Sequence, residues 1–498
     1  MTEPQKGEHV EYREIEGKIP EPVFRYFKEL SAIPRGSGNT RAASDYCVRF
    51  AVEHGLSYRQ DAADNVIIYK EATKGYEHAP TVMLQGHLDM VCGKDPGVAH
   101  DFSKDGIRLI LDGDELRADG TTLGGDDGIA VAYALAILAS DEISHPNLEC
   151  VFTSDEEIGM VGAGKLDMKN LHASYLLNLD SEEEGCFLAG CAGGIRYDIQ
   201  VPFAFEKKQG TAVAIRLSGL FGGHSGADIH LGRANAIMVL AGILDELLLH
   251  FPTLGLIGFS GGSQDNAIPR EGELKVLVPC ELIDQVRDQA GMMEKVLKKE
   301  YGTTDPGLTL TAEVSVEEDR EHSVLSDREA ARASAFLLNL PNGVFSMSKE
   351  LPGLVETSMN VGIVSLTENG LSASCLIRSS KTSGKRALRR RLEALTDLTG
   401  GSFFTSGDYP EWEFVPDSPL LELLKVVYRE QYGEEPRIET IHAGVECGLF
   451  AAGIPGLMAV SLGPDIRDIH SPGERMSVSS VNRVWNFLIE VLKRIKDA

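Results

Sequence analysis

Short apolar runs alternate with amphipathic segments through the first 194 residues of the chain, and again after residue 409. The runs predict buried strands at 65–70, 81–85, 148–153, 175–179 and 457–462. The amphipathic segments predict helices at 40–55, 420–432 and 478–496, and an almost wholly apolar segment predicts a buried helix at 129–140. This alternation is typical of an α/β fold, in which helices flank a sheet.

The segment from 195 to 408 has a different pattern. Strand-like runs occur at 213–217, 257–260, 273–278, 308–314, 360–365 and 371–378, and long helical patterns at 233–250, 282–300, 328–340 and 385–398. Such a mixture is typical of an α+β domain, and the segment is long enough for two units of sheet and helix. We find no internal repeat and no low-complexity tract in the sequence.

Four predicted strands of the α/β part are followed by acidic or imidazole side chains. These side chains are His87, Asp89, Glu156, Glu157, Asp180 and His470. Because ligands bind beyond the carboxyl ends of the strands in an open α/β sheet, we expect them to converge. Imidazole and carboxylate groups are ligands for zinc and similar metals, and a carboxylate near a histidine can orient its ring.

Two adjacent aspartates, Asp126 and Asp127, stand at the start of the buried helix predicted at 129–140. Burying both carboxylates is costly unless they cap the helix or meet a cation. Capping explains one of them better than it explains both. Since His470 must join ligands that lie before residue 190, the middle segment is predicted to interrupt a discontinuous domain made of residues 1–194 and 409–498.

Length and composition restrict the class of protein. A chain of 498 residues with 43% hydrophobic and 25% charged residues is typical of a soluble globular protein with two or more domains. A net charge of −27 argues against nucleic acid or an anionic membrane as partner. The sequence contains no run of about 18 apolar residues, so it predicts no membrane span. The start of the sequence lacks the apolar stretch of a secretory signal, and the scattered cysteines fit a reducing cytoplasm.

Several short motifs occur along the chain in a fixed order. They are Gly-His-Leu-Asp-Met-Val at 86–91, Leu-Gly-Gly-Asp-Asp-Gly at 123–128, Asp-Glu-Glu-Ile-Gly-Met at 155–160, Gly-Gly-His-Ser-Gly at 222–226, His-Ala-Gly-Val-Glu-Cys-Gly at 442–448 and His-Ser-Pro at 470–472. Together with the acidic run at 180–184 they resemble the aminoacyl-histidine dipeptidases, also called Xaa-His or carnosinase-like dipeptidases, within a wider group of two-zinc exopeptidases. The resemblance covers nearly the whole chain. It implies a discontinuous two-metal exopeptidase domain with a mixed sheet, and an inserted α+β lid or dimerisation domain at 195–408.

The resemblance also implies a role for each matching residue of the metal site. His87 and Asp180 would hold one zinc ion, Glu157 and His470 the other, and Asp126 would bridge the pair. Oxygen and imidazole donors make zinc the default pair of ions, although Mn²⁺ and Co²⁺ accept the same ligands.

The catalytic roles follow from the same resemblance. Asp127 would follow Asp126 through a cis peptide, Asp89 would orient His87, and Glu156 would be the general base for a hydroxide shared by the two metal ions. The spacing of the residues alone does not separate the roles of Glu156 and Glu157. For the donor that stabilises the tetrahedral oxyanion we select His224, against the alternative of a simple tight turn at 222–226.

Four residues are candidates for contacts with the substrate. They are Asn266, Arg378, Gly444 and Glu446. Arg378 ends a predicted strand, where its guanidinium can bind a C-terminal carboxylate through two hydrogen bonds. Gly444 and Glu446 lie on a predicted loop. An ordinary solvated or turn residue remains the alternative for each of the four.

The sequence thus predicts a cytoplasmic metallo-dipeptidase that acts on small peptides and prefers histidine at the C-terminal position. The alternatives on the same scaffold are a tripeptidase, an N-acyl amino acid deacylase or a carboxypeptidase. A non-catalytic binding protein is the alternative from another class, and the intact set of potential ligands argues against it. A homodimer is possible, and His224 acts either within its own chain or across such a dimer.

Overall fold

The computed structural model describes residues 20–315 and 320–497, so the N-terminal stretch on which the expectation of no secretory signal rests lies outside the described residues. The chain forms two compact units. The first unit comprises residues up to 191, 414–440 and 445 onward, and the second unit comprises 192–413 and 441–444. Within the described ranges, no helix is long and apolar enough to cross a membrane.

The first unit is built on an eight-stranded mixed sheet in the order β1-β2-β6-β3-β7-β22-β8-β21. The strands are β1 Ser57–Gln60, β2 Val66–Lys70, β3 Val82–His87, β6 Leu148–Thr153, β7 Tyr175–Asn178, β8 Cys186–Cys191, β21 Arg437–Ile441 and β22 Met458–Ser461. Neighbours among β6, β3, β7 and β22 are parallel, so their carboxyl ends lie at the same edge of the sheet. Ligand sites of open α/β sheets lie at such an edge.

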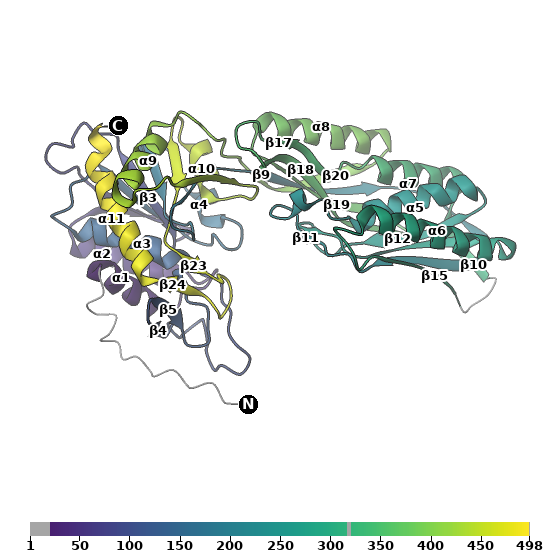
Figure 1. Ribbon diagram of the computed structural model, residues 1–498, viewed down its shortest axis with the longest axis horizontal. Helices are drawn as coiled ribbons and strands as arrows, with labels where there is room; N and C mark the ends of the chain where they lie inside the picture. The colour runs from purple at the N-terminus through teal and green to yellow at the C-terminus, as the bar shows by residue number, and fades with distance from the viewer. Residues whose placement is uncertain (1–19, 316–319, 498) are drawn as a thin grey trace. The chain divides into compact units, whose positions relative to one another are not determined.

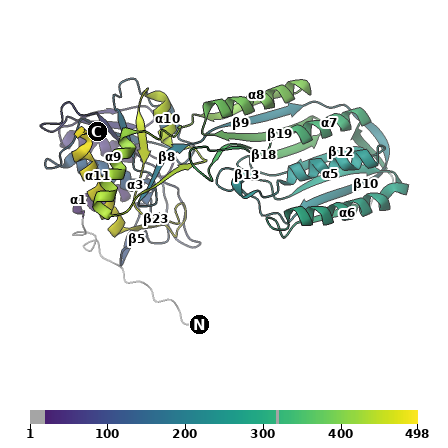
Figure 2. The same ribbon diagram turned by 45° about the horizontal axis from the view of Figure 1, so that its top comes forward.

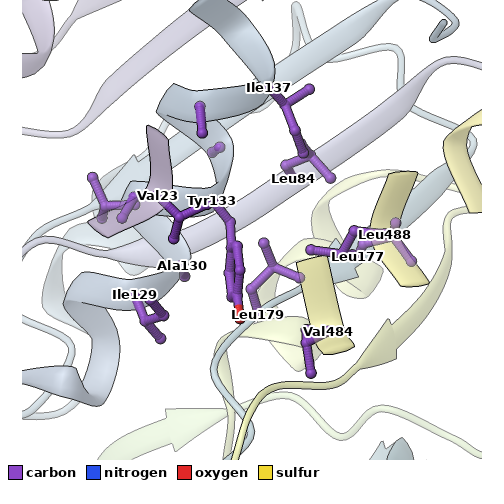
Figure 3. Packing of buried hydrophobic residues seen from close by; sticks show 14 of the residues in the cluster. Val23, Leu84, Ile129, Ala130, Tyr133, Ile137, Leu177, Leu179, Val484 and Leu488 are labelled. Atoms are coloured by element: carbon purple, nitrogen blue, oxygen red, sulfur yellow. The ribbon is translucent and has the colours of Figure 1, made fainter. Parts of the chain in front are cut away.

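Helices pack around this sheet (Figure 1). They are α1 Glu21–Ser31, α2 Arg41–Glu53, α3 Gly125–Ala139, α4 Val161–Lys165, α9 Pro419–Tyr432, α10 Glu446–Gly453 and α11 Val478–Arg494. Figure 3 shows Tyr133 of α3 among Leu84 and Leu177 of the sheet, Val23 of α1 and Leu488 of α11, and all five are buried. The apolar helix α3 is therefore the centre of the hydrophobic core, and its first turn is fixed in place by that packing.

A small four-stranded sheet stands beside the core of the first unit, in the order β23-β24-β5-β4. Its strands are β4 Leu109–Asp112, β5 Glu115–Ala118, β23 Ile466–Arg467 and β24 Arg475–Ser477. The connection between β23 and β24 carries His470, so the pairing of these two strands holds that loop at both ends.

The second unit contains two modules with the same βαββαβ topology. One module runs through β10 Phe205–Ser218, α5 Ala236–His250, β12 Gly255–Gly261, β14 Gly272–Val278, α6 Ile283–Tyr301 and β15 Thr309–Val314. The other runs through β9 Gly193–Val201, α7 Asp327–Asn339, β18 Val355–Thr367, β19 Gly370–Ser379, α8 Thr382–Leu398 and β20 Ser402–Tyr409. The strand orders are β15-β10-β14-β12 and β20-β9-β19-β18. If the four strands of each module are numbered along the chain, both sheets have the order 4-1-3-2.

The two modules join edge to edge through antiparallel pairing of β12 with β18, where Ser260 lies opposite Ser365. Helices α5, α6, α7 and α8 lie along one face of the combined sheet (Figures 1 and 2), and a single hydrophobic core joins that face to the helices. The remaining strands are β11 Gly223–His224, β13 Ala267–Ile268, β16 Arg320–Leu325 and β17 Gly343–Met347. The sequence showed no repeat, yet the topology is duplicated. The duplication is hidden because one module is inserted between β9 and α7 of the other.

Most predicted elements are present, with ends shifted by a few residues. The largest extension is β10, which begins at Phe205 although the sequence predicted a strand only from 213. Helix α3 begins at Gly125, four residues before its predicted start, because the turn that holds Asp126 and Asp127 joins it despite non-helical backbone angles at both. The architecture is the α/β fold with an additional α+β unit that the sequence predicted. The lid and dimerisation roles of the second unit remain predictions.

Candidate metal centre and active site

The structure brings all five predicted metal ligands of the first unit together. His87 ends β3, Glu157 follows β6, and Asp180 follows β7. Asp126 lies in the first turn of α3, and His470 lies in the loop between β23 and β24. The convergence arises because three of these residues leave the sheet at the same edge.

Asp126 occupies the middle of this cluster. Its Oδ1 is 3.0 Å from His87 Nε2 and its Oδ2 is 3.1 Å from His470 Nε2. His87 Nε2 also lies 3.5 Å from Asp180 Oδ1, and His470 Nε2 lies 3.1 Å from Glu157 Oε2. The side chains therefore fall into two groups that share one carboxylate. The peptide bond from Asp126 to Asp127 is cis.

Asp89 is completely buried behind the ring of His87. His87 Nδ1 faces both Asp89 Oδ1 at 3.4 Å and the Asp89 carbonyl oxygen at 3.2 Å. The same carboxylate accepts hydrogen bonds from the backbone N–H of Glu156 and Glu157 and from Ser37 Oγ. Burial by itself raises the pKa of Asp89, but its hydrogen bonds and the charge of His87 lower it to about 2. An ionised Asp89 thus orients His87 and fixes the backbone of both glutamates.

The centre holds more buried negative charge than its imidazoles can balance. Burial, followed by repulsion from nearby carboxylates, raises the pKa of Asp127 and Asp180 well above the usual range. Burial also raises the pKa of Glu156 to about 8, with further contributions from Glu446 and Glu157. Such a cluster is costly without cations.

The donors fit two divalent cations. His87, Asp126 and Asp180 would hold one, and His470, Asp126 and Glu157 the other. Ligand atoms of His87, Asp126 and Glu157 lie within 4.8 Å of one another, and Glu157 Oε1 is buried with no hydrogen-bond partner among the described residues. Imidazole and carboxylate donors suit zinc, manganese and cobalt alike.

His224 belongs to the second unit and lies on the short strand β11. Its Nδ1 accepts hydrogen bonds from the backbone N–H groups of Gly226 and Ala227, at 3.3 Å and 3.0 Å. A ring nitrogen that accepts carries no proton, so these contacts assign the proton to Nε2. Burial, and then the charge of Arg378, lower the pKa of His224. The ring is therefore a neutral donor at Nε2.

Arg378 and Gly444 lie together in the second unit. Arg378 is 6% exposed, and its Nη1 donates a hydrogen bond to Tyr409 Oη at 2.9 Å. A Cβ atom at Gly444 would lie 2.5 Å from a carbon of the Tyr409 ring, so that ring fits only against a glycine. Asn266 is exposed, and its backbone carbonyl oxygen accepts a hydrogen bond from Ser225 N, beside His224.

His442 and Ser358 form a pair near Arg378, and the sequence assigned neither of them a role. His442 is buried, and its Nε2 lies 2.7 Å from Ser358 Oγ. Burial and the charge of Arg378 lower the pKa of His442 to about 3, so it is neutral at physiological pH. The motif at 442–448 contained His442, but only the fold places it beside a strand some 80 residues earlier.

Glu446 does not lie on a loop, as the sequence predicted, but is the first residue of α10. It is fully buried in the first unit, where its Oε2 accepts hydrogen bonds from Gln85 Nε2 at 2.5 Å and Thr153 Oγ1 at 2.7 Å. Burial raises its pKa to about 7. Its contacts are therefore with the ends of β3 and β6, and a contact with substrate remains a prediction.

Comparison with known proteins places the chain in a family. The model of peptidase family M20/M25/M40 matches residues 83–494, and the chain belongs to that family. The predicted class, a metallopeptidase enzyme, is confirmed. The chain is 39% identical over 494 residues to the cytosol non-specific dipeptidase of Escherichia coli, covering 97% of this chain and 99% of the relative.

Solved structures extend the comparison. The aminoacylhistidine dipeptidase from Vibrio alginolyticus is 38% identical and superposes with a TM-score of 0.91, covering 96% of this chain and 97% of that one. The aminopeptidase PepT from Bacillus cereus shares the fold, with a TM-score of 0.55 at 16% identity over 95% of this chain and 98% of that one.

Replacing the shared carboxylate tests the centre. Asp126→Asn should lower the bound metal from about two divalent ions per chain to less than one, because an amide has one acceptor where two cations need a carboxylate oxygen each. Metal content of purified protein, measured by plasma mass spectrometry, gives the answer. The control is Asp155→Asn, which changes a neighbouring carboxylate outside the ligand groups and should retain both ions. Equal metal in both variants would contradict the assignment of Asp126.

Proposed function

We propose that this protein is a two-metal dipeptidase that hydrolyses dipeptides and prefers histidine at the C-terminal position. The observation that carries the proposal is the shared position of Asp126 between the two imidazole-containing groups. The names of the Escherichia coli and Vibrio alginolyticus relatives support dipeptides as the substrate class. One relative is called a non-specific dipeptidase and the other an aminoacylhistidine dipeptidase, so the preference for histidine is the finer part of the proposal. The cytosolic name of the first relative supports a cytoplasmic location.

The reaction needs an attacking water, a base and a donor to the carbonyl oxygen. Divalent cations in the centre would supply Lewis acidity and lower the pKa of a nearby water. Glu156 accepts the proton of the attacking water and passes it to the departing amine, because it lies beside the ligand groups but outside them. The backbone N–H of Glu156 donates a hydrogen bond to Asp89, which fixes the position from which the Glu156 side chain extends. Glu157, the neighbouring residue, faces His470 and acts as a ligand.

The second unit supplies groups that recognise the peptide. His224 offers a neutral Nε2–H, which suits it to donate to the oxyanion of the tetrahedral intermediate without first losing a proton. Arg378 carries a buried charge and donates a hydrogen bond to the neutral phenol of Tyr409, so a peptide C-terminal carboxylate would balance that charge. His224 serves either its own chain or a partner in a homodimer, and mixed dimers of two inactive variants distinguish these arrangements.

A panel of substrates tests the function. The metal-loaded protein should hydrolyse β-alanyl-histidine and other Xaa-His dipeptides with the highest kcat/KM, other dipeptides less well, and tripeptides and N-acetyl amino acids poorly. Dipeptide amides are the matched control, because they lack the carboxylate that Arg378 would bind. Preferential hydrolysis of tripeptides or N-acetyl amino acids would overturn the proposal. Equal rates for all dipeptides would overturn the histidine preference alone.

The adjacent glutamates should behave differently when each is replaced. Glu156→Gln is expected to keep its metal and lose about 100- to 10,000-fold in kcat, since the base is removed and the ligands remain. Glu157→Gln is expected to lose metal. Metal content and kcat, both measured on each variant, show which glutamate is the base and which is the metal ligand. An exchange of the two outcomes would show that the assignment is off by one residue.

His224→Ala should lower kcat by about 100- to 1,000-fold while metal content stays at the wild-type level, because a donor and no ligand is lost. Mixing His224→Ala chains with Glu156→Gln chains then tests the geometry. Recovered activity in mixed dimers shows that His224 acts across a dimer. If subunits exchange and no activity returns, His224 acts within one chain. A His224→Ala variant with normal kcat would refute the role itself.

A further inference from the structure

Arg35, which follows α1, holds the backbone of two ligand-bearing segments at once. Its side chain is buried, with 2% exposure. Nη1 donates hydrogen bonds to the carbonyl oxygens of Leu88 and Asp89, both at 2.9 Å, and Nη2 donates to the carbonyl oxygen of Gly124 at 2.5 Å. The first two carbonyls lie just after His87, and the third lies two residues before Asp126. One guanidinium therefore connects the His87 segment to the Asp126 segment.

Glu474 makes the complementary connection through backbone amides. It is also 2% exposed, and it lies four residues after His470 in the same loop. Its Oε2 accepts hydrogen bonds from the N–H groups of Leu123 and Gly124, and its Oε1 from those of Gly125 and Asp126, at 2.8 to 3.4 Å. Free amides at the start of a helix are a favourable site for a carboxylate. Glu474 thereby connects the His470 loop to the first turn of α3.

The two side chains meet at Gly124. Arg35 binds the carbonyl oxygen of this residue and Glu474 binds its N–H. Gly124 has a φ of +68°, and a Cβ atom there would lie 2.5 Å from Arg35 Nη2, so both the backbone conformation and the available space require glycine. The segment that carries Asp126 is therefore held on both sides by buried charges, although neither of these charged side chains belongs to the ligand groups.

We propose that Arg35 and Glu474 are positioning residues of the metal centre, each responsible for one of its two cation sites. Arg35 fixes His87 relative to Asp126 and so sets the site that includes Asp180. Glu474 fixes His470 relative to Asp126 and so sets the site that includes Glu157. The inference rests on the two-metal centre of the proposed function.

The physical reason is that metal sites tolerate little displacement of their ligands. Ligand distances vary by only about 0.2 Å, and residues that orient ligands typically contribute about 10- to 100-fold in affinity. Burying an arginine and a glutamate is costly unless all their polar atoms are satisfied. Here three carbonyls of the ligand segments accept from the two Nη atoms of Arg35, whose Nε has no partner among the described residues, and four amides donate to both oxygens of Glu474.

The test is a metal titration that resolves the two sites. Metal-free protein is titrated with Co²⁺, followed by its visible spectrum, and with Zn²⁺ in competition with a chromophoric chelator. His87→Ala and His470→Ala first assign each binding step, because each variant removes a ligand of one site. Arg35→Met should then weaken the step lost in His87→Ala by about 10- to 100-fold, and Glu474→Gln should weaken the step lost in His470→Ala to a similar degree.

Lys70→Met is the matched control. The ammonium of Lys70 also donates to three carbonyl oxygens of the α3 region, those of Ile137, Leu138 and Ser140, but at the opposite end of the helix from Asp126. Its replacement should lower the melting temperature of the metal-free protein and leave both binding steps unchanged. Arg35→Lys is measured beside Arg35→Met. Lysine keeps the positive charge but lacks the planar guanidinium that bonds to three carbonyls. Arg35→Lys should therefore weaken the step lost in His87→Ala, by a smaller factor than Arg35→Met does.

Two results would overturn the proposal. One is that Arg35→Met and Glu474→Gln bind both cations with the same affinities as Lys70→Met. If Arg35→Met does not fold, Arg35→Lys takes its place in this comparison. The other is equal weakening of both steps by each variant, which would indicate a general loss of structure. A wild-type protein that binds no cation would instead refute the metal centre and the proposed function. If the wild type binds two cations and the Arg35 and Glu474 variants bind them with wild-type affinity, only the positioning roles are refuted.

Discussion

Burying Asp126 between two imidazoles is the constraint on which the rest of the first unit depends. Its two oxygens lie 3.0 Å and 3.1 Å from His87 Nε2 and His470 Nε2. One carboxylate can serve two histidines from distant parts of the chain only if their backbones are fixed independently. Parallel strands do this for His87, the pairing of β23 with β24 does it for the His470 loop, and the core around α3 does it for Asp126 itself.

The second unit carries the residues proposed to bind the peptide. Two modules of equal topology share one continuous sheet through the pairing of β12 with β18. His224 comes from the module that contains β10, whereas Arg378 and Tyr409 come from the other. The proposed recognition residues of this unit are therefore drawn from both modules, so the pairing of β12 with β18 fixes the two sets within one sheet.

The sequence was sufficient to predict the α/β fold class, because long apolar strands and adjacent polar residues leave a clear local pattern. The same pattern pointed to the strand-end residues His87, Glu157 and Asp180, whereas Asp126 lies in the first turn of α3 and His470 in the loop between β23 and β24. Edge strands such as β20, with Phe404 exposed, carry no such pattern and were missed. Arg35 and Glu474 were missed for another reason: their partners are backbone groups about 50 to 350 residues away, which no local motif reveals. The position of Glu446 at the start of a buried helix was likewise invisible, since its partners lie on β3 and β6.

The central claim is that two cation sites share Asp126. Anomalous diffraction from crystals grown with zinc or manganese tests it most directly. Two anomalous peaks are expected, one adjoining His87, Asp126 and Asp180 and the other adjoining His470, Asp126 and Glu157. A single peak, or two peaks of which only one contacts Asp126, would contradict it.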